Sequence, residues 1–303
     1  MHMLGAHARL RMGPVALEYD VGLHRRLRIA AERREGTIWD TRLATPNAGT
    51  SERVAILILL SGSITWHGED GWAIVAPAAF LASANQVEGA GGRWLHTFRS
   101  EGSPFSTVEV QVARALVCAF DRPTPLGLAP VVVTAARAHA ALVHGQAAGA
   151  HELREGREQT TRALLHAIHV EEVLTVDLAT ELEPMTMTDQ ALWSVLAPLV
   201  EDFEILPSLD GTGAKAGLSA RQLTRRLEGF LARLELPWGG WREVTRGYRL
   251  KVAVMLLSSE ELPIADVARR CGYSSAEALA HALTTEGLPA PSELRRRLLA
   301  NLG

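Results

Sequence analysis

A segment near the C-terminus, residues 264–297, constrains the fold more than any other part of the chain. Its first apolar residues recur at the spacing of one helix face, namely Ile264, Val267, Ala268 and Cys271. Gly272 follows where a helix end with positive φ is expected. Ser274 and Glu277 can then form a capping box at the start of a second helix, with a buried face of Leu279, Ala282 and Leu283. Two short helices joined by a tight turn form a helix-turn-helix.

The same pattern occurs a second time upstream, in residues 218–231. Ser219 and Gln222 can form a capping box, and the helix that follows has an apolar stripe of Leu223, Leu227, Phe230 and Leu231. Residues 241–257 predict one long amphipathic helix between the copies, with Leu250, Ala253, Val254 and Leu257 on its buried face. Three glycines (Gly211, Gly213 and Gly217) predict that the helix before the upstream cap is short.

These motifs resemble those of the AraC/XylS family of bacterial transcription regulators. The segment 249–257 fits the family pattern RLxxAxxLL, 264–268 fits IaeVA, 271–275 fits xGFsS and 291–295 fits PsEyR. The resemblance covers residues 190–300 and implies two helix-turn-helix units, bridged by a long helix, that bind double-stranded DNA. The chain departs from the family where Gly287-Leu288 replaces a Phe-Gly pair, and where residues 230–247 exceed the usual length.

Residues opposite the apolar stripes, or on the flanks beside them, are the candidates for contact with DNA. They are Arg221, Gln222, Thr224 and Arg225 in the first unit, and Ser275, Glu277 and His281 in the second. Arg can bond to guanine and Gln to adenine in the major groove, so the first unit should dominate binding. The second unit offers no cation except a protonated His281, which leaves open a regulator that has lost specific DNA binding and acts through protein contacts. The run 295–297 adds three arginines for phosphate contacts or for a solvated helix end.

The charge is unevenly distributed along the chain. The net charge is -3 overall, but residues 208–303 contain 14 Lys and Arg against 10 Asp and Glu, a net of +4. The remaining residues carry a net of -7. This asymmetry favours a basic DNA-binding part on an acidic body.

The first 120 residues predict a small β-barrel. Runs of β-branched and aromatic residues, separated by turn-forming residues, cover 37–43, 54–67, 72–82, 93–99 and 105–112. Residues 59–83 are similar to the cupin pattern, and residues 131–205 predict two or three helices with a break at Glu183-Pro184. The fold class is therefore α+β with two domains. We expect a cupin-like barrel or jelly roll over 1–125, a helical connector over 126–190 and a double helix-turn-helix domain over 191–303.

Three side chains in the barrel, Trp66, Trp94 and His96, predict a pocket for a small organic effector, because they combine apolar faces with polar tips. The alternative is that they simply fill the barrel. A metal cupin needs an HxH pair with a Glu and a later His, whereas only His67, Glu69 and His96 are candidates here. We therefore expect no metal, no cofactor and no enzyme activity, with a cupin-type enzyme as the second alternative.

The composition and the N-terminal residues indicate the cellular location of the protein. No run of 18 apolar residues predicts a membrane span, the N-terminal residues lack the apolar region of a secretory signal, and two cysteines predict no disulfide framework. We therefore expect a cytoplasmic protein without a membrane partner. The Ala- and Leu-rich helices of 131–205, together with the resemblance, predict a homodimer. RNA polymerase remains open as a further partner.

Overall fold

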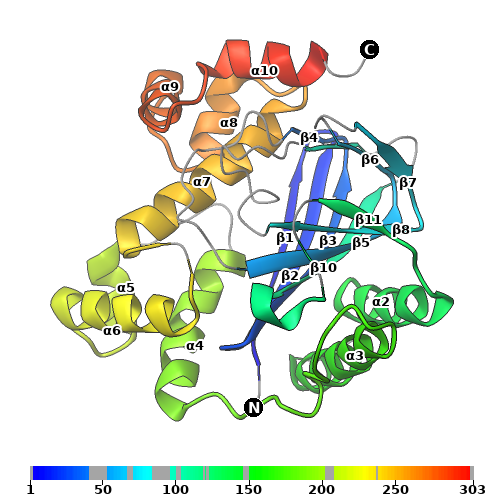
Figure 1. Cartoon of the computed structure of the whole chain (residues 1–303). Coiled ribbons are helices and arrows are strands. Elements are labelled where there is room, and N and C mark those ends of the chain that lie inside the picture. Colours follow the sequence, from blue (N-terminus) through cyan, green and yellow to red (C-terminus); the bar gives the residue numbers. More distant parts are fainter. Residues whose placement is uncertain are drawn as a thin grey trace.

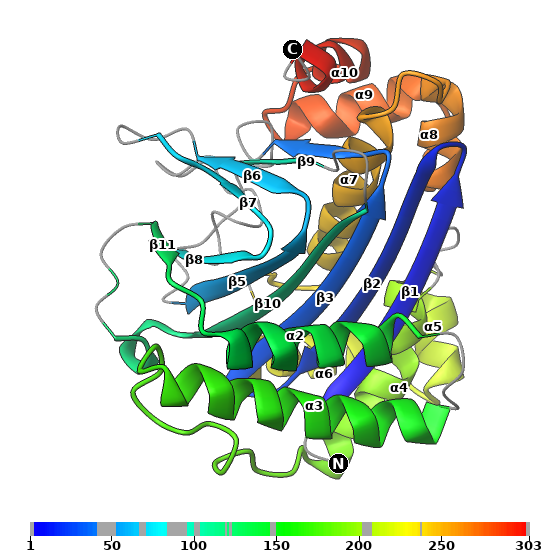
Figure 2. The same ribbon diagram turned by 90° about the vertical axis from the view of Figure 1, so that its right-hand side faces the viewer.

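The computed structural model describes residues 3–40, 53–66, 71–83, 96–99, 104–118, 120, 123–145, 150–201, 208–236 and 238–300. The N-terminal part contains two antiparallel sheets. The larger has the strand order β1-β2-β3-β10-β5-β8-β11 and the smaller β4-β9-β6-β7. Figure 2 shows the smaller sheet lying over one end of the larger one, as expected for a barrel or jelly roll.

The strands of the larger sheet are β1 (Leu4–Met12), β2 (Val15–Leu23), β3 (Leu27–Glu35), β5 (Arg53–Ser61), β8 (Ala78–Ser83), β10 (Phe105–Ala113) and β11 (Thr124–Leu126). Those of the smaller sheet are β4 (Ile38–Asp40), β6 (Ser63–Trp66), β7 (Ala73–Val75) and β9 (His96–Arg99). A 3-10 turn, η2 (Arg114–Leu116), follows β10. The helices are α2 (Pro130–Val143), α3 (Ala150–Val170), α4 (Met187–Glu201), α5 (Leu209–Lys215), α6 (Ala220–Arg233), α7 (Trp241–Leu257), α8 (Ile264–Arg270), α9 (Ala276–Thr285) and α10 (Pro291–Ala300).

The strand prediction was incomplete at the N-terminus, where β1, β2 and β3 form three long strands before the first predicted one. Their charged and small residues have low β propensity, which hid them. The period-2 signal was nevertheless present, because Leu4, Ala6, Ala8 and Leu10 alternate with more exposed residues along β1. Two predicted strands are also divided, 54–67 at Gly62 and 72–82 at Ala76-Pro77. The predicted helices of residues 131–205 are present as α2, α3 and α4, and the predicted break at Glu183-Pro184 lies in the non-helical segment between α3 and α4.

The larger sheet is buried on both faces. On one face, Ile56, Ile58 and Val110 join a cluster with Ala136 of α2 and Leu165 of α3. On the other face, Leu57, Leu59, Phe80 and Phe105 belong to a cluster that continues into α7, α8, α9 and α10. This two-sided burial explains the nearly uninterrupted apolar run of β5.

A third cluster ties the N-terminal strands to the first helix-turn-helix. Leu4 and Val21, from β1 and β2, share it with Trp193 of α4 and Phe230 of α6. The indole of Trp193 stacks on the ring of Phe230, and its Nε1 donates a 2.8 Å hydrogen bond to the carbonyl of Gly5. The larger sheet and the C-terminal helices therefore share their hydrophobic cores.

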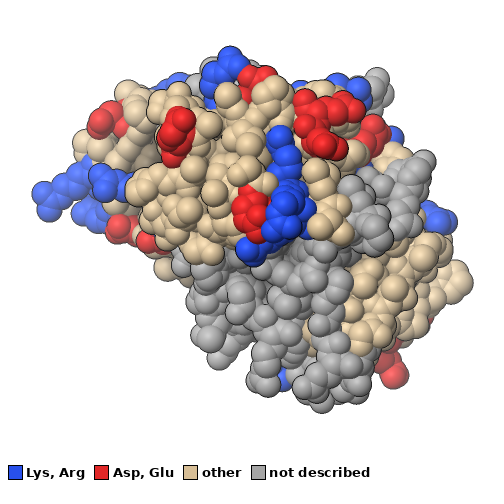
Figure 3. Space-filling model, turned by 90° about the horizontal axis from the view of Figure 1, so that it is seen from above, with Lys and Arg blue, Asp and Glu red and all other residues tan. Residues whose placement is uncertain are grey.

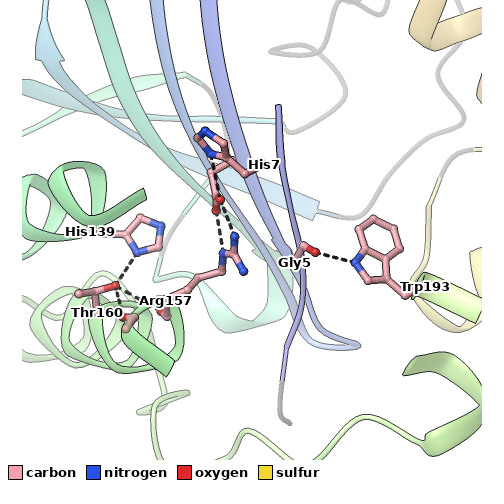
Figure 4. A network of polar contacts seen from close by, with 8 residues as sticks. Gly5, His7, His139, Arg157, Thr160 and Trp193 are labelled. Atoms are coloured by element: carbon pink, nitrogen blue, oxygen red, sulfur yellow. Dashed lines mark hydrogen bonds and ion pairs between the residues drawn. The ribbon is translucent and has the colours of Figure 1, made fainter. Parts of the chain in front are cut away.

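A buried polar network joins β1 and β2 to the α2–α3 pair (Figure 4). Arg157 of α3 donates two hydrogen bonds, of 2.8 and 2.6 Å, to the carboxylate of Asp20. Its guanidinium lies across β1 at Gly5, where an added Cβ would stand 2.1 Å from Nη1. Burial alone would raise the pKa of Asp20, but contacts with His7 and Arg157 outweigh it and lower that pKa. Asp20 is therefore held as a carboxylate.

His139 of α2 is fully buried beside this ion pair, and its Nδ1 lies 2.8 Å from the hydroxyl of Thr160. Burial lowers its pKa from 6.5 to about 4, because the charged imidazolium would lose its hydration. Below pH 6.5 the unfolded chain therefore binds a proton that the folded chain does not take up until the pH approaches 4. The contribution of His139 to folding stability must fall as the pH falls through this range.

We predict that replacing His139 by Gln removes a pH-dependent loss of about 2 kcal/mol in the free energy of unfolding between pH 7 and pH 5. Urea titrations of the native chain and the variant at the two pH values measure it. The variant His281→Gln is the control, because His281 lies exposed on α9. A variant at position 139 with the same acid sensitivity as the native chain would contradict the prediction.

Candidate DNA-binding units and an interface cavity

The first helix-turn-helix consists of α5 and α6. The capping box of Ser219 and Gln222 is confirmed: the Ser219 hydroxyl accepts from the Gln222 N–H, and the Gln222 Oε1 accepts from the Ser219 N–H. The predicted stripe of α6 is buried, with Leu223, Leu227, Phe230 and Leu231 all at most 3 % exposed. The preceding helix α5 is short, as its glycines predict.

The second unit consists of α8 and α9, and one detail of its prediction was wrong. Gly272 ends α8 with φ +74°, as expected. However, the cap of α9 is Ser275, whose hydroxyl accepts from the Ala278 N–H, so the helix begins one residue later than a Ser274–Glu277 box would place it. Both serines suit the role, and the sequence alone does not separate neighbouring caps.

All four helices of the two units end in the same backbone motif. In each, the N–H two residues beyond the C-cap donates to a carbonyl five positions earlier, over 2.8 to 3.0 Å. The residue between adopts positive φ, and it is glycine after α5, α8 and α9 (Gly217, Gly272 and Gly287). After α6 it is Glu235, with φ +51°.

The long helix α7 bridges the two units, as predicted. Its residues Leu250, Ala253, Val254 and Leu257 are buried, and the Tyr248 hydroxyl donates to the Val200 carbonyl of α4 over 2.7 Å. Figure 1 shows α6 and α9 on the same side of the molecule, below and above α7. The second helix of each unit, α6 or α9, therefore lies on the same side of the molecule.

The predicted contact residues differ in how free their side chains are. Arg221, Arg225, Glu277 and His281 are exposed, and Thr224 is half-buried. Gln222 is exposed, but its amide oxygen is used in the helix cap, so contact with adenine would require the cap to open. The side chain of Ser275 is likewise used as a cap. The sequence reasoning did not single out Arg226, a third exposed cation on α6 beside Arg225.

The three arginines of α10 have local partners. Arg295 donates to the carbonyls of Leu257 and Leu262, which joins α10 to the end of α7. Arg296 and Arg297 both bond to the carboxylate of Glu293, and these bonds lower the pKa of Glu293 to about 2. Figure 3, viewed from above, shows Lys and Arg side chains gathered at the left edge, on the side where Figure 1 places α6. Elsewhere on this face basic and acidic side chains are mixed.

A cavity of about 220 Å³ lies between the larger sheet and helices α4, α6 and α7. The sheet contributes residues such as Leu57 and Phe105. The helices and the loop between α6 and α7 contribute three indoles together with further apolar side chains (Trp193, Trp238, Trp241, Leu196, Leu227, Leu231, Leu236 and Met255). The sequence did not predict this cavity, because its walls come from segments far apart in the chain. Its walls therefore belong to both the N-terminal sheet and the C-terminal helices.

The charged residues of the cavity wall are concentrated on β3, β10 and α7. They are Arg28, Glu32, Arg34, Glu109 and Lys251. Arg28 donates a 2.6 Å hydrogen bond to the Tyr19 hydroxyl, Arg34 bonds to Glu32, and the Lys251 ammonium lies 5.9 Å from the centre of the Trp238 ring. An apolar chamber with a few polar groups at its wall is typical of sites for small organic molecules.

The predicted effector residues lie elsewhere or outside the described side chains. Trp66 of β6 is 7 % exposed and stacks on Trp72 with 6.2 Å between ring centres, and it is not among the described residues that line the cavity. His96 faces Trp66 in the register of β9 and β6, but only its backbone is described. Trp94 lies outside the described residues. The effector site inside the barrel therefore stays a prediction.

Metal-binding candidates are few in the part of the chain that the structure describes. No group of three or more His, Cys, Asp or Glu side chains there could hold a metal ion. His67 and Glu69 lie outside it, and the Nδ1 of His166 pairs with Asp177 at 2.8 Å. Among the same residues, no helix has the length and apolar character that crossing a membrane requires.

Comparison with known proteins finds neither a matching family model nor a matching curated protein. Among solved structures, the chain is similar to the apo form of a ToxT variant from Vibrio cholerae, with 10 % identity over 89 % of this chain and 97 % of that one (TM-score 0.37). It is also similar to wild-type ToxT bound to an unsaturated fatty acid, with 12 % identity over 90 % and 96 % (TM-score 0.35). The transcriptional regulator CdpR from Pseudomonas aeruginosa matches 62 % of this chain and 45 % of that one, at 18 % identity (TM-score 0.30).

Proposed function

We propose that this protein is a sequence-specific DNA-binding transcription regulator whose first helix-turn-helix is controlled by a small organic effector. The observation that carries the proposal is the shared cavity wall. Leu227 and Leu231 of α6 face the same chamber as Leu57 and Phe105 of the sensor sheet. A molecule in the cavity would contact the DNA-binding helices and the sensor at once, so it could favour one arrangement of the two over another.

The first unit has the chemistry for DNA binding. Three exposed arginines lie in one six-residue stretch of α6, residues 221–226, while the sequence of α9 contains no Lys or Arg. Arginine can bond to guanine O6 and N7 in pairs or hold phosphate groups. The family resemblance of the helix-turn-helix motifs supports the same assignment.

The lack of cations on α9 favours a second candidate, a regulator that acts through protein contacts without specific DNA binding. The deciding experiment is selection from a pool of duplexes with a randomised centre of about 30 bp, wide enough for two half-sites, followed by sequencing. Recovery of one shared motif supports the proposed function. Recovery of none, together with binding that vanishes with rising salt, favours the second candidate.

We predict that Arg225→Ala costs about 1 to 3 kcal/mol of binding free energy on the selected duplex, because one bidentate base contact is lost. His281→Ala should cost less. Arg137→Ala, on the exposed face of α2, is the control for loss of one positive charge outside the units. Fluorescence anisotropy titrations measure all three, and a larger loss for His281→Ala than for Arg225→Ala would reverse the ranking of the units.

We further propose that the effector is largely apolar with a polar end, and that it occupies the interface cavity. As a probe we choose 1-anilinonaphthalene-8-sulfonate, an aromatic anion that fluoresces on entering an apolar site. The variant Val200→Trp, on the cavity wall, should weaken its binding about ten-fold or more, which is about 1.4 kcal/mol. Val170→Trp, exposed on α3, is the matched control. Equal affinities for the two variants would place the probe outside the cavity.

We also propose that the protein is a homodimer, because a dimer would place two first units on repeated half-sites. The Ala- and Leu-rich helices of residues 131–205 and the family resemblance support this. Light scattering at micromolar concentration should give twice the chain mass of 32.8 kDa. A mass of one chain would contradict the proposal.

A further inference from the structure

Glu235 occupies a backbone position that the other helices of the two units give to glycine. The hydrogen bond from Leu236 N–H to the Leu231 carbonyl matches those that follow Gly217, Gly272 and Gly287. Glycine adopts positive φ more readily than a residue with a Cβ, so glutamate at φ +51° is the less favourable residue at this position. Since α9 ends with Gly287 in the same motif, the duplicated unit itself shows that the turn does not require a carboxylate.

The carboxylate of Glu235 is bound by an arginine of the sensor. Arg53, the first residue of β5, has a side chain only 7 % exposed, and its Nε and Nη2 lie 3.2 and 3.1 Å from Glu235 Oε2. Nη2 also donates to the Leu234 carbonyl at 3.3 Å and to the Arg25 carbonyl at 3.1 Å. One guanidinium therefore joins β5, the β2–β3 turn and the C-terminal end of α6.

A second contact holds the same end of α6. Arg233, in the last turn, bonds to Asp189 of α4, which also accepts from the Thr186 hydroxyl at 2.7 Å. The guanidinium of Arg25 lies 3.8 Å from Asp189. Burial would raise the pKa of Asp189, but the hydrogen bonds from Arg233 and Thr186 and the nearby positive charges lower it. Asp189 therefore stays charged, and the two contacts meet at the β2–β3 turn.

This end of α6 also lies beside the interface cavity. Leu231 and Leu236, on either side of the Arg53 contact in sequence, both line the cavity wall. A displacement of these residues by a bound molecule would move the backbone that carries the Leu234 carbonyl and Glu235. The contact is therefore placed to respond to the contents of the cavity.

We propose that the Arg53–Glu235 contact is a latch through which the sensor sheet fixes the position of α6, with Arg53 as the positioning residue. Glu235 then completes the latch with its carboxylate, at a φ that favours glycine. The consequence for DNA binding rests on the proposed function, whereas the placement of α6 relative to the sheet does not. At the corresponding position after α9, Gly287 has no side chain with which to form such a latch.

The test measures distances between spin labels in the full-length chain by double electron–electron resonance, without DNA or effector. The labelled chain is mixed with an excess of unlabelled chain, so that a homodimer contains one labelled chain. Cys118, the exposed cysteine, is first replaced by Ser, while Cys271 is buried and stays. One label at Val131→Cys on α2 marks the sensor. The second is at Glu228→Cys on α6 or, in a separate sample, at Thr285→Cys on α9.

We predict that Arg53→Gln and Glu235→Gly each broaden or displace the distance distribution between positions 131 and 228. The distribution between 131 and 285 should stay as in the native chain. Glu235→Gly is the sharper variant, because glycine suits the positive φ and so favours the helix end while removing the latch. A merely structural role at the helix end would therefore leave the α6 distances unchanged in this variant.

The matched control is Glu172→Gly, because Glu172 follows α3 with φ +58° and takes no part in the latch. It should leave both distributions unchanged. If Arg53→Gln does not fold, Glu235→Gly decides alone. The proposal is overturned if the α6 distances in Glu235→Gly match those of the native chain, or if the α6 and α9 distances broaden together. Because neither readout uses DNA, failure of the DNA-binding proposal would leave this result intact.

Discussion

The burial of the larger sheet on both faces is the constraint on which the rest of the structure depends. A sheet with one face exposed would need only the α2–α3 pair, and the C-terminal helices could then move independently. Here Leu57 and Leu59, on the second face of β5, share a core with Leu250 and Val254 of α7. Separating the two parts would expose this apolar area to water, at roughly 25 cal/mol for each Å². The helix-turn-helix units are thus held in a defined position by the larger sheet.

The contact between the larger sheet and the C-terminal helices includes the interface cavity, whose wall is chemically distinctive. Three indoles and several aliphatic side chains line the cavity without filling it. Well-packed interiors contain few voids of this size, so an apolar chamber at a boundary between two parts is a natural site for a ligand. A molecule bound there would gain contacts from both walls. Its effect on DNA binding would equal the difference between its affinities for the two arrangements of those walls.

The sequence predicted local features far better than distant contacts. The helix-turn-helix units were predicted because an apolar period, a glycine and a serine cap lie within a few residues of one another, as in Val267, Gly272 and the two serines that follow it. The error at Ser274 was of the same local kind, since two neighbouring serines offer the same hydroxyl. The strands β1 to β3 were missed because charged residues on their exposed positions masked the alternation of the buried ones. The cavity and the contact of Arg53 with Glu235 could not be predicted, since 182 positions separate those two residues.

The duplication of the helix-turn-helix makes the difference between α6 and α9 informative. Both helices have a serine cap, a buried leucine stripe and the same backbone motif at their ends. Of the two, α6 combines exposed arginines, a share of the cavity wall and a charged contact at its C-terminal end with β5. If α6 contributes most of the affinity for DNA, an effector that moves this one helix controls binding without disturbing the second unit. The helix α9 lacks arginine, and none of the residues described at the cavity wall comes from α9. This helix can therefore hold a constant position while α6 changes.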